Sequence, residues 1–464
     1  MISSPNAEIF PNLGRARVHL RCFTKGVIMN CFSISVLPKI PALAVLFFII
    51  AFHSALYSQS INPLNEVNPP NSASPYTVTA LVNGRLIDGL GGTPVENATI
   101  LIKGNRISEV GSGIAIPAEA QVVDLEGMTV LPGLVDAHLH TVNDNSTLNT
   151  FLRHGVTTMR DPGHPFRFYQ SIHFAEAPLP RIFLTGAHLD AYPGVYTQQA
   201  MMIKDHDHVR EVIKSYVEQG SSGLKIYFRL PLNFYETVLQ TAAFYGIPVV
   251  AHLEMVPAEA AIRAGLKGIE HVTSFGTSLA DPKDAEEFIK GVEENNSYRN
   301  EGRYRLWSGI DLEHDRVGFL LALAAKEKVA LCPTLATFER QKGDEGVSDD
   351  QAEGFKNMIK LVGMAHKAGV RIVTGSHTHG NYAESGWAYQ REMELMVAAG
   401  MTPLEVITAS TLHTAEYLGS SSRIGSIEMG KLADLVIVEG NPAVEIQDMY
   451  KIQRVMLNGL WIGD

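Results

Sequence analysis

The chain has 464 residues, of which 45% are hydrophobic and 19% charged, and its formal net charge is −11. This composition is typical of a folded globular protein and excludes collagenous, low-complexity and disordered classes. The negative net charge argues against a nucleic-acid-binding protein, which usually presents a basic surface to phosphate groups. Three cysteines are too few for a disulfide framework.

Residues 1–58 are predicted to be an export leader, with Met29 as an alternative start. Residues 40–52 are uninterruptedly apolar, a run shorter than the ~20 residues that a transmembrane helix needs but long enough for the core of a signal peptide. Small and polar residues follow, so we expect cleavage near Ser58, export to the periplasm or the exterior, and no stable membrane insertion afterwards. The alternative is a protein anchored by its uncleaved leader. Residues 59–75, rich in Pro, Asn and Ser, are predicted to be a linker.

Both ends of the remaining chain are rich in short β-type runs broken by Gly and Asn. In the first of these regions Gly104-Asn105 separates two such runs, which is a hairpin signal. We expect residues 76–132 and 421–464 to form one small β-sandwich domain together.

Residues 133–420 alternate between apolar strand candidates and helix-like segments, a pattern that predicts a parallel α/β sheet. Eight such units fit a (β/α)8 TIM barrel. An open doubly wound sheet is the alternative, but no Gly-x-Gly-x-x-Gly turn supports it. Residues 283–316 are expected to be a charged, less regular insertion that covers the barrel mouth. The strand candidates are 134–140, 154–161, 180–186, 222–228, 247–254, 267–274, 329–335 and 369–376.

Polar side chains end several of these predicted strands. His138 and His140 lie two residues apart, so both point to one face of a strand, and two adjacent imidazoles suit a divalent metal. Burial of Lys225 in an apolar strand would lower its pKa, and the neutral amine could form a metal-binding carbamate with carbon dioxide; alternatively, Lys225 reaches solvent at the strand end. His252 and His271, one βα unit apart, are ligand candidates or core histidines. Active-site groups of barrels lie at the C-terminal strand ends, so the five together favour a metal site.

The chain resembles the metal-dependent amidohydrolase superfamily, close to its imidazolonepropionase-like and prolidase-like members, from about Tyr76 to Asp464. The resemblance implies a (β/α)8 barrel with a small β-sandwich built from both termini. The motifs that carry it are LPGLVDAHLH (131–140), GVTTMRDPG (155–163), GLKIYF (223–228), VVAHLE (249–254), IEHV (269–272) and RIGSIEMGKLADLVIVEGNP (423–442).

By this resemblance, His138 and His140 would bind one divalent metal ion, and His252 and His271 a second. Lys225, as a carbamate, would bridge the two. The resemblance implies one or two ions, zinc first and manganese or another divalent metal as alternatives.

The family ends its last barrel strand with Gly-Thr-Asp, whereas residues 375–379 are Gly-Ser-His-Thr-His. His377 therefore stands where the resemblance expects a metal-binding, proton-carrying aspartate. A neutral imidazole can ligate metal and act as a general base, so His377 stays a candidate for both roles. His379 is an alternative two residues away.

The implied activity is hydrolysis of a small amide, lactam or dipeptide at a C–N bond through a metal-activated hydroxide. His377 would move the proton to the leaving nitrogen. Tyr227, on the strand face of Lys225, would hydrogen-bond the oxyanion or be a packed aromatic. One alternative is an impaired binding protein on the same scaffold, because His377 replaces the aspartate; another is a metal-dependent esterase or lactonase. A homo-oligomer is compatible with the resemblance.

The remaining polar candidates belong to loops and strand ends. We expect Arg160 and Asp161 to form a buried ion pair that braces the barrel. The others are candidates for substrate contact or surface packing: His188, Asp190 and Tyr192 on a loop at the same face, and Tyr304, Arg305 and Trp307 in the insertion.

Overall fold

The computed structural model describes residues 16–24, 27–36, 66–140 and 144–463. It divides into two compact units, Met1–Asn62 and Pro63–Asp464. In the first unit, β1 (Ala16–Thr24) and β2 (Val27–Val36) pair antiparallel. The apolar run 40–52, on which the leader prediction rests, lies outside the described residues. Within the described ranges, no helix is both long and apolar enough to cross a membrane.

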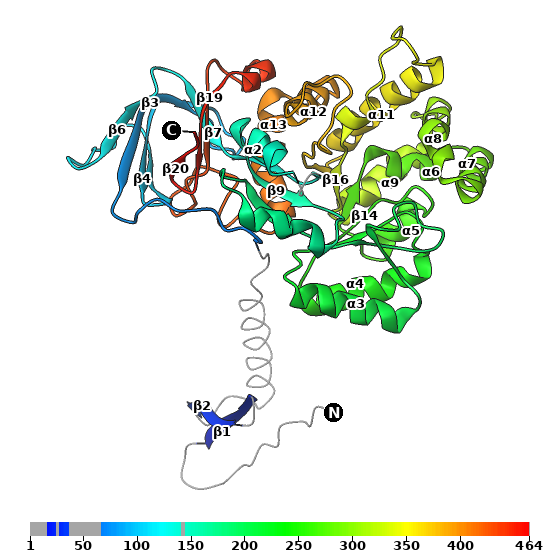
Figure 1. The fold of residues 1–464 in the computed structure, drawn as a ribbon, viewed down its shortest axis with the longest axis horizontal. Helices are drawn as coiled ribbons and strands as arrows, with labels where there is room; N and C mark the ends of the chain where they lie inside the picture. Colours follow the sequence, from blue (N-terminus) through cyan, green and yellow to red (C-terminus); the bar gives the residue numbers. More distant parts are fainter. Residues whose placement is uncertain (1–15, 25–26, 37–65, 141–143, 464) are drawn as a thin grey trace. The chain divides into compact units, whose positions relative to one another are not determined.

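In the second unit, strands from both ends of the sequence form one eight-stranded sheet, on the left of Figure 1. The strands are β3 (Val78–Leu86), β4 (Val95–Lys103), β5 (Arg106–Gly111), β6 (Gln121–Asp124), β7 (Thr129–Pro132), β18 (Leu435–Val438), β19 (Ile452–Leu457) and β20 (Leu460–Trp461). Their order is β20-β19-β18-β7-β3-β4-β5, with β6 pairing with β3. Gly104, with φ 59°, lies in the turn of the β4–β5 hairpin, where the Gly-Asn dipeptide predicts it.

Each of the eight strand candidates of the middle region contains an observed strand. These are β8 (Leu134–Asp136), β9 (Val156–Asp161), β10 (Arg181–Leu184), β13 (Leu224–Ile226), β14 (Val249–Ala251), β15 (Gly268–Glu270), β16 (Ala330–Cys332) and β17 (Arg371–Ile372). With β11 (His188–Asp190) and β12 (Ala200–Met202), they form parallel sheets of order β10-β9-β8 and β12-β11-β13-β14-β15-β16-β17.

Backbone hydrogen bonds connect the edges of these two parallel sheets. They run from Ala137 N to Thr374 O (2.9 Å), from His377 N to His138 O (2.7 Å) and from Ser222 N to Leu184 O (2.7 Å). The first two join the segment after β8 to the segment after β17, and the third joins β10 to the segment before β13. This parallel α/β architecture fits a TIM-barrel-like domain.

Helices connect the strands and lie outside them (Figure 1). The α-helices are α2 (Asn145–Arg153), α3 (His206–Glu218), α4 (Tyr235–Tyr245), α5 (Ala258–Arg263), α6 (Gly276–Leu279), α7 (Pro282–Glu294), α8 (Arg299–Ser308), α9 (Asp315–Lys326), α10 (Leu335–Phe338), α11 (Asp349–Lys367), α12 (Ala388–Ala398), α13 (Pro403–Thr408) and α14 (Thr414–Tyr417). The short helical turns are η1 (Phe166–Phe174), η2 (Leu232–Phe234), η3 (Val272–Phe275), η4 (Asn296–Tyr298), η5 (Ala409–His413) and η6 (Ile446–Tyr450).

The insertion at 283–316 is helical, so the expectation of an irregular segment is wrong. Helix α7 begins after Asp281, whose side chain accepts a hydrogen bond from the Lys283 backbone, and Pro282 occupies its first turn. Ala285, Phe288 and Val292 are its buried residues. They recur at helical spacing, a pattern hidden among the charged residues that separate them.

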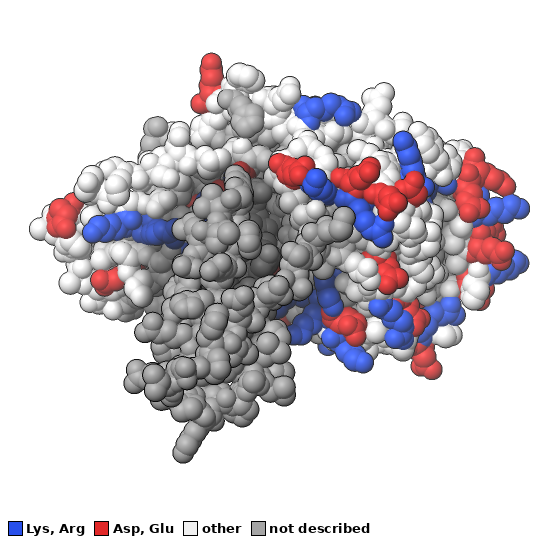
Figure 2. All heavy atoms as spheres, turned by 90° about the horizontal axis from the view of Figure 1, so that it is seen from below, with Lys and Arg blue, Asp and Glu red and all other residues white. Residues whose placement is uncertain are grey.

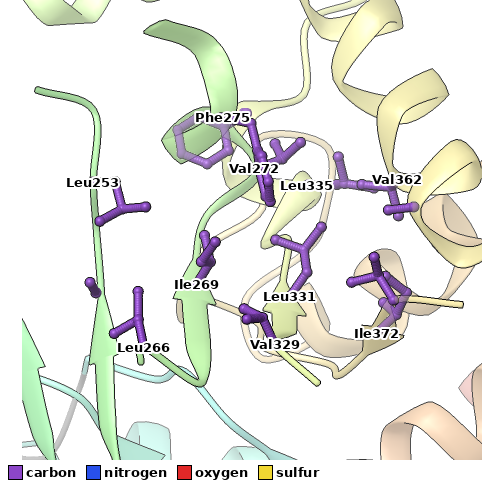
Figure 3. Close-up of a cluster of buried hydrophobic side chains, with 14 of the residues drawn as sticks. Leu253, Leu266, Ile269, Val272, Phe275, Val329, Leu331, Leu335, Val362 and Ile372 are labelled. Carbon is purple, nitrogen blue, oxygen red and sulfur yellow. The ribbon is translucent and has the colours of Figure 1, made fainter. Parts of the chain in front are cut away.

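A hydrophobic core packs between the parallel strands and the helices outside them. Figure 3 shows Ile269 of β15, Leu331 of β16 and Ile372 of β17 on the side of the strands that faces Val362 of α11. These side chains are almost fully buried. Burial of each such aliphatic side chain contributes about 1.5–3 kcal/mol, so this layer fixes the positions of the strands that bear the polar residues.

The residues between these core positions point to the opposite face, because successive side chains of a strand alternate. Leu224 and Ile226 belong to the core cluster, and Lys225 between them points inward. Glu270 and Cys332 follow Ile269 and Leu331 in the same way and are fully buried. These strands therefore carry buried polar side chains on the face opposite their core residues.

Acidic and basic side chains are interspersed over the described part of the face in Figure 2. Several form exposed pairs, such as Arg210 with Asp207 and Arg305 with Glu287. Exposed pairs typically contribute about 0–1 kcal/mol each. The apolar core is accordingly the main source of the fold's stability.

Replacement of Gly375 by alanine is predicted to destabilise the folded protein. A Cβ at this position would lie 2.5 Å from Cys332 Sγ and 2.7 Å from His138 Cβ. Gly375→Ala should lower the free energy of unfolding by about 1–3 kcal/mol, as overpacking does, measured by denaturant titration. Gly318→Ala in α9 is the matched control: no atom lies within 4 Å of its Cβ, so it should stabilise by about 0.5–1 kcal/mol. Equal stability of the two variants would contradict this packing.

Candidate metal centre

Five histidines at the ends of β8, β14, β15 and β17 form one cluster. The ring centroids of His138 and His271 lie 4.5 Å apart, as do those of His252 and His271. His377 lies 5.1 Å from His140 and 5.2 Å from His138. The structure therefore brings together the five histidines that the resemblance implies as metal ligands, His138, His140, His252, His271 and His377.

The ring nitrogens of three of these histidines face one another. Nε2 of His138 and Nε2 of His140 are 2.9 Å apart, and the ligand nitrogens of His138, His140 and His377 all lie within 4.8 Å of one another. Burial, with the Lys225 ammonium among the further causes, lowers the pKa of all three. These imidazoles are therefore neutral at physiological pH, the form that binds metal.

Lys225 of β13 lies close enough to the same cluster for its charge to lower the pKa of His138 and His271. Burial lowers its pKa to about 8, against the opposing effect of the Glu270 carboxylate. Its charge contributes to the lowered pKa of His252 and His271 as well. An appreciable fraction of this lysine is therefore a neutral amine just above physiological pH.

The second ring nitrogen of two cluster histidines is held by a neighbouring side chain. Glu270 Oε2 lies 2.5 Å from His138 Nδ1, and Thr334 Oγ1 lies 2.7 Å from His271 Nδ1. Such partners orient an imidazole and leave its other nitrogen for a metal. Sequence reasoning missed both residues. The position of Glu270, directly before His271, was the available signal for one of them.

The predicted ion pair between Arg160 and Asp161 is wrong. Adjacent strand residues point to opposite faces, and Arg160 pairs with Glu270 instead. Asp161 Oδ2 accepts a hydrogen bond from His164 Nδ1 at 2.7 Å, and its Oδ1 lies 3.7 Å from His140 Nδ1. Asp161 and His164 thus extend the cluster on the side of His140, a role that the sequence did not reveal.

The donor set fits a divalent metal. Nδ1 of His252 is buried without a hydrogen-bond partner among the described residues, which is costly unless another group engages it. Its Nε2 lies 3.4 Å from Glu254 Oε1. Neutral imidazoles with buried carboxylates nearby are the ligand chemistry of zinc and related ions. His138, His140 and His377 form one candidate ligand group.

The backbone is unusual at the strand ends that bear these residues. Positive φ angles occur at Glu254 (23°), His271 (67°), Thr334 (51°), His377 (55°) and Thr378 (74°). Non-glycine residues rarely adopt this region, and such strain concentrates at functional sites.

The other sequence candidates have mixed positions. His379 is exposed and Tyr192 is 78% exposed, so neither belongs to the cluster. His188 is buried with its ring centroid 4.4 Å from that of Tyr227, next to the site. Tyr304 and Trp307 are core residues. Arg305 is exposed.

Glu392 of α12 supports the turn that carries Thr334. Its Oε2 accepts a hydrogen bond from Ala336 N at 2.7 Å in α10, the helix that Thr334 precedes. Burial raises the pKa of Glu392 to about 8. This carboxyl group therefore stabilises, from outside the cluster, the segment that orients His271.

Comparison with known proteins places the chain within a broad group. The family model described as "Amidohydrolase family" matches residues 129–462. An adenine deaminase of Mesorhizobium japonicum is 23% identical over 383 residues, which are 79% of this chain and 55% of the deaminase. The chain thus spans about half the length of the curated relatives it matches.

Solved structures that are similar to this one include two with a TM-score of 0.64. A Xaa-Pro dipeptidase with bound methionine in the active site is 22% identical, over 83% of this chain and 99% of that one. The A. niger ochratoxinase is 21% identical, over 84% of this chain and 96% of that one. At these identities the likeness shows the fold alone.

Thr334→Val is predicted to weaken metal binding. The substitution keeps the shape of the side chain but removes the partner of His271 Nδ1, so zinc affinity should fall about 10- to 100-fold in a chelator competition titration. Thr273→Val is the control, because Thr273 Oγ1 is buried with no hydrogen-bond partner in the described part of the chain. Unchanged zinc affinity in Thr334→Val would contradict the proposed role of Thr334 in orienting His271.

Glu392→Gln should change the pH dependence of stability. The pKa of this group is about 8 in the folded protein and about 4.5 in the unfolded chain, so the folded state binds the extra proton between these values. The wild type should lose stability, relative to Glu392→Gln, by up to about 1.4 kcal/mol per pH unit from about pH 5 to about pH 8. Urea unfolding across this range measures the difference, and parallel curves for the two proteins would refute it.

Proposed function

Because the chain belongs to the amidohydrolase family, we propose that it is a metal-dependent hydrolase of C–N bonds in small amide, lactam or dipeptide substrates. The observation that carries the proposal is the convergence of five neutral imidazoles and a buried lysine at the C-terminal ends of parallel strands. Relatives named as an adenine deaminase and a Xaa-Pro dipeptidase support C–N bond chemistry.

We assign His138 and His140 to one divalent ion and His252 and His271 to a second. Lys225, as a carbamate, would hold both. Its pKa of about 8 supports this assignment, since only the neutral amine reacts with carbon dioxide. Zinc fits the imidazole donors best. A bound ion would supply a Lewis acid that activates water and polarises the substrate carbonyl.

Tyr227 is proposed to donate a hydrogen bond to the carbonyl oxygen of the substrate. Its Oη accepts a hydrogen bond from Arg299 Nη1 at 3.0 Å, which leaves its own O–H free to donate. Burial raises the pKa of this phenol despite Arg299, so it stays protonated. Its ring centroid is 5.2 Å from that of His252. A fixed donor beside the reacting group stabilises the charge that develops on the oxygen.

His377 is proposed either to ligate metal beside His138 and His140 or to carry the proton to the leaving nitrogen, because a neutral imidazole has only one unprotonated nitrogen for these two roles. Burial lowers its pKa well below the usual histidine value, so the ring is neutral and one nitrogen carries a lone pair for either role. Compared with a carboxylate, this imidazole makes the site more positive by one unit.

We also propose that the parallel strands close as a (β/α)8 barrel over residues 133–420, with a β-sandwich from residues 76–132 and 421–464. The backbone bonds between the edges of the two parallel sheets support closure. Export by residues 1–58 is proposed on the apolar run 40–52 alone.

Lys225→Ala and His252→Ala are predicted to abolish hydrolysis and to lower bound metal, because each removes a ligand. A panel of dipeptides, N-acyl amino acids and lactams, assayed with the zinc- or manganese-loaded protein, tests this. His379→Ala, which alters an exposed histidine outside the cluster, should keep the wild-type rate. Full activity in both ligand variants would rule out the metal-dependent reaction.

The same panel separates the alternative functions. Hydrolysis of esters or lactones without hydrolysis of amides would identify an esterase or lactonase. Binding without hydrolysis would identify a binding protein. In that case His377→Asp, which restores the family's aspartate, should create hydrolytic activity. If the wild type is instead an active enzyme adapted to histidine, the same substitution should lower kcat.

A further inference from the structure

An arginine of helix α8 reaches to the edge of the imidazole cluster. Arg299 is only 8% exposed. Its Nη1 donates to Tyr227 Oη at 3.0 Å, and its Nη2 donates to Tyr196 Oη at 3.1 Å. Tyr227 in turn lies against His252. A single tyrosine side chain therefore separates this guanidinium from the candidate metal ligands.

The charges at this edge do not balance. Glu254 Oε1 lies 2.8 Å from Arg303 Nη2, and Glu254 Oε2 lies 3.9 Å from Arg299 Nη1. One carboxylate thus faces two guanidinium groups, whose side chains are 10% and 12% exposed.

The neighbouring charged pair does not remove this excess. Arg229 donates its backbone N–H to Asp190 Oδ1 and directs its guanidinium to Asn296. Burial raises the pKa of Asp190 to about 7, although Arg229 and Arg299 both oppose this rise. Near neutral pH Asp190 therefore carries only part of a negative charge, which these two arginines share. A buried excess of positive charge is costly unless an anion joins it.

Arg299 also has unused hydrogen-bonding capacity and a fixed orientation. A guanidinium has five N–H donors. Within the described ranges, the guanidinium of Arg299 uses two of them, one for each tyrosine hydroxyl. Nε of Arg303 is buried and has no hydrogen-bond partner among the described residues, whereas its Nη2 faces Glu254. The rings of Tyr196 and Phe228 lie 5.7 and 5.1 Å from the Arg299 guanidinium carbon, which restricts its plane.

We propose that Arg299, assisted by Arg303, forms a subsite that binds a carboxylate of the substrate beside the scissile amide. The inference rests on the proposed hydrolase function and narrows its substrate class to N-acyl amino acids and dipeptides with a free carboxylate. The planar fork of a guanidinium matches a carboxylate in two parallel hydrogen bonds. The single excess charge matches a monoanion rather than a phosphate dianion.

The position of the subsite adds a second role for the same contact. When Arg299 binds the carboxylate, its hydrogen bond to Tyr227 keeps the phenol aligned with the reacting carbonyl. A substrate that lacks the carboxylate leaves both arginines unpaired in a buried setting. Its kcat/KM should therefore be lower by about 10- to 100-fold or more.

Matched substrate pairs test this subsite in the metal-loaded full-length protein. Each pair is an N-acyl amino acid or dipeptide and the same compound with its carboxylate converted to a carboxamide. The quantity measured is the ratio of the two kcat/KM values. Loss of Tyr227 alignment slows both members alike, so the ratio isolates recognition of the carboxylate.

The wild type should prefer the carboxylate, and Arg299→Met should bring the ratio close to one. Arg299→Lys, which keeps the charge but loses the fork, should give an intermediate ratio, and Arg303→Met a smaller loss. Arg305→Met is the control: Arg305 lies on the same helix, is exposed and pairs with Glu287, and its substitution should leave the ratio unchanged. A wild-type ratio near one, or one unaffected by Arg299→Met, would overturn the subsite.

Calorimetry with N-acetyl amino acids and their carboxamides separates this inference from the proposed function. Carboxylate-selective binding that Arg299→Met weakens about tenfold or more supports the subsite even if no compound is hydrolysed, in which case the hydrolase proposal fails alone. If amides are hydrolysed without preference for the carboxylate over the carboxamide, and binding is not selective for the carboxylate, the hydrolase proposal holds and the subsite proposal is overturned. Absence of both hydrolysis and selective binding overturns the two together.

Discussion

The buried carboxylate of Glu270 is the interaction on which the candidate site depends. It pairs with Arg160, accepts a hydrogen bond from Tyr417 Oη at 3.0 Å and lies 2.5 Å from His138 Nδ1. Removing one partner of a buried charged pair typically costs about 3–5 kcal/mol, because the other charge stays desolvated. Three strands and helix α14 are thus tied to the same group that orients a ligand imidazole.

The alternation of strand side chains explains how a stable core and a polar site share the same short strands. Leu224 and Ile226 pack outward against helices, and Lys225 between them points inward. The cost of burying the lysine appears as a pKa lowered to about 8. The same burial keeps the surrounding imidazoles neutral, so the core also prepares the ligands for a metal.

Much of this arrangement follows from local pattern in the sequence. Apolar runs of strand length predicted the parallel strands, and the two-residue spacing of His138 and His140 predicted their shared face. Contacts between distant strands were not predictable, because nothing local encodes which side chain lies opposite. Glu270 was missed for that reason, and Arg160 was wrongly paired with Asp161. The helical insertion that carries Arg299 was missed because its buried residues are sparse among charged ones.

The central claim is that the imidazole cluster holds a divalent ion, and the metal content of the purified chain tests it most directly. The protein would be expressed with added zinc or manganese, freed of loosely bound ions and analysed by elemental mass spectrometry. The account predicts at least one tightly bound ion per chain, and two if the Lys225 carbamate bridges a pair. A chain that retains no metal under either condition would contradict it.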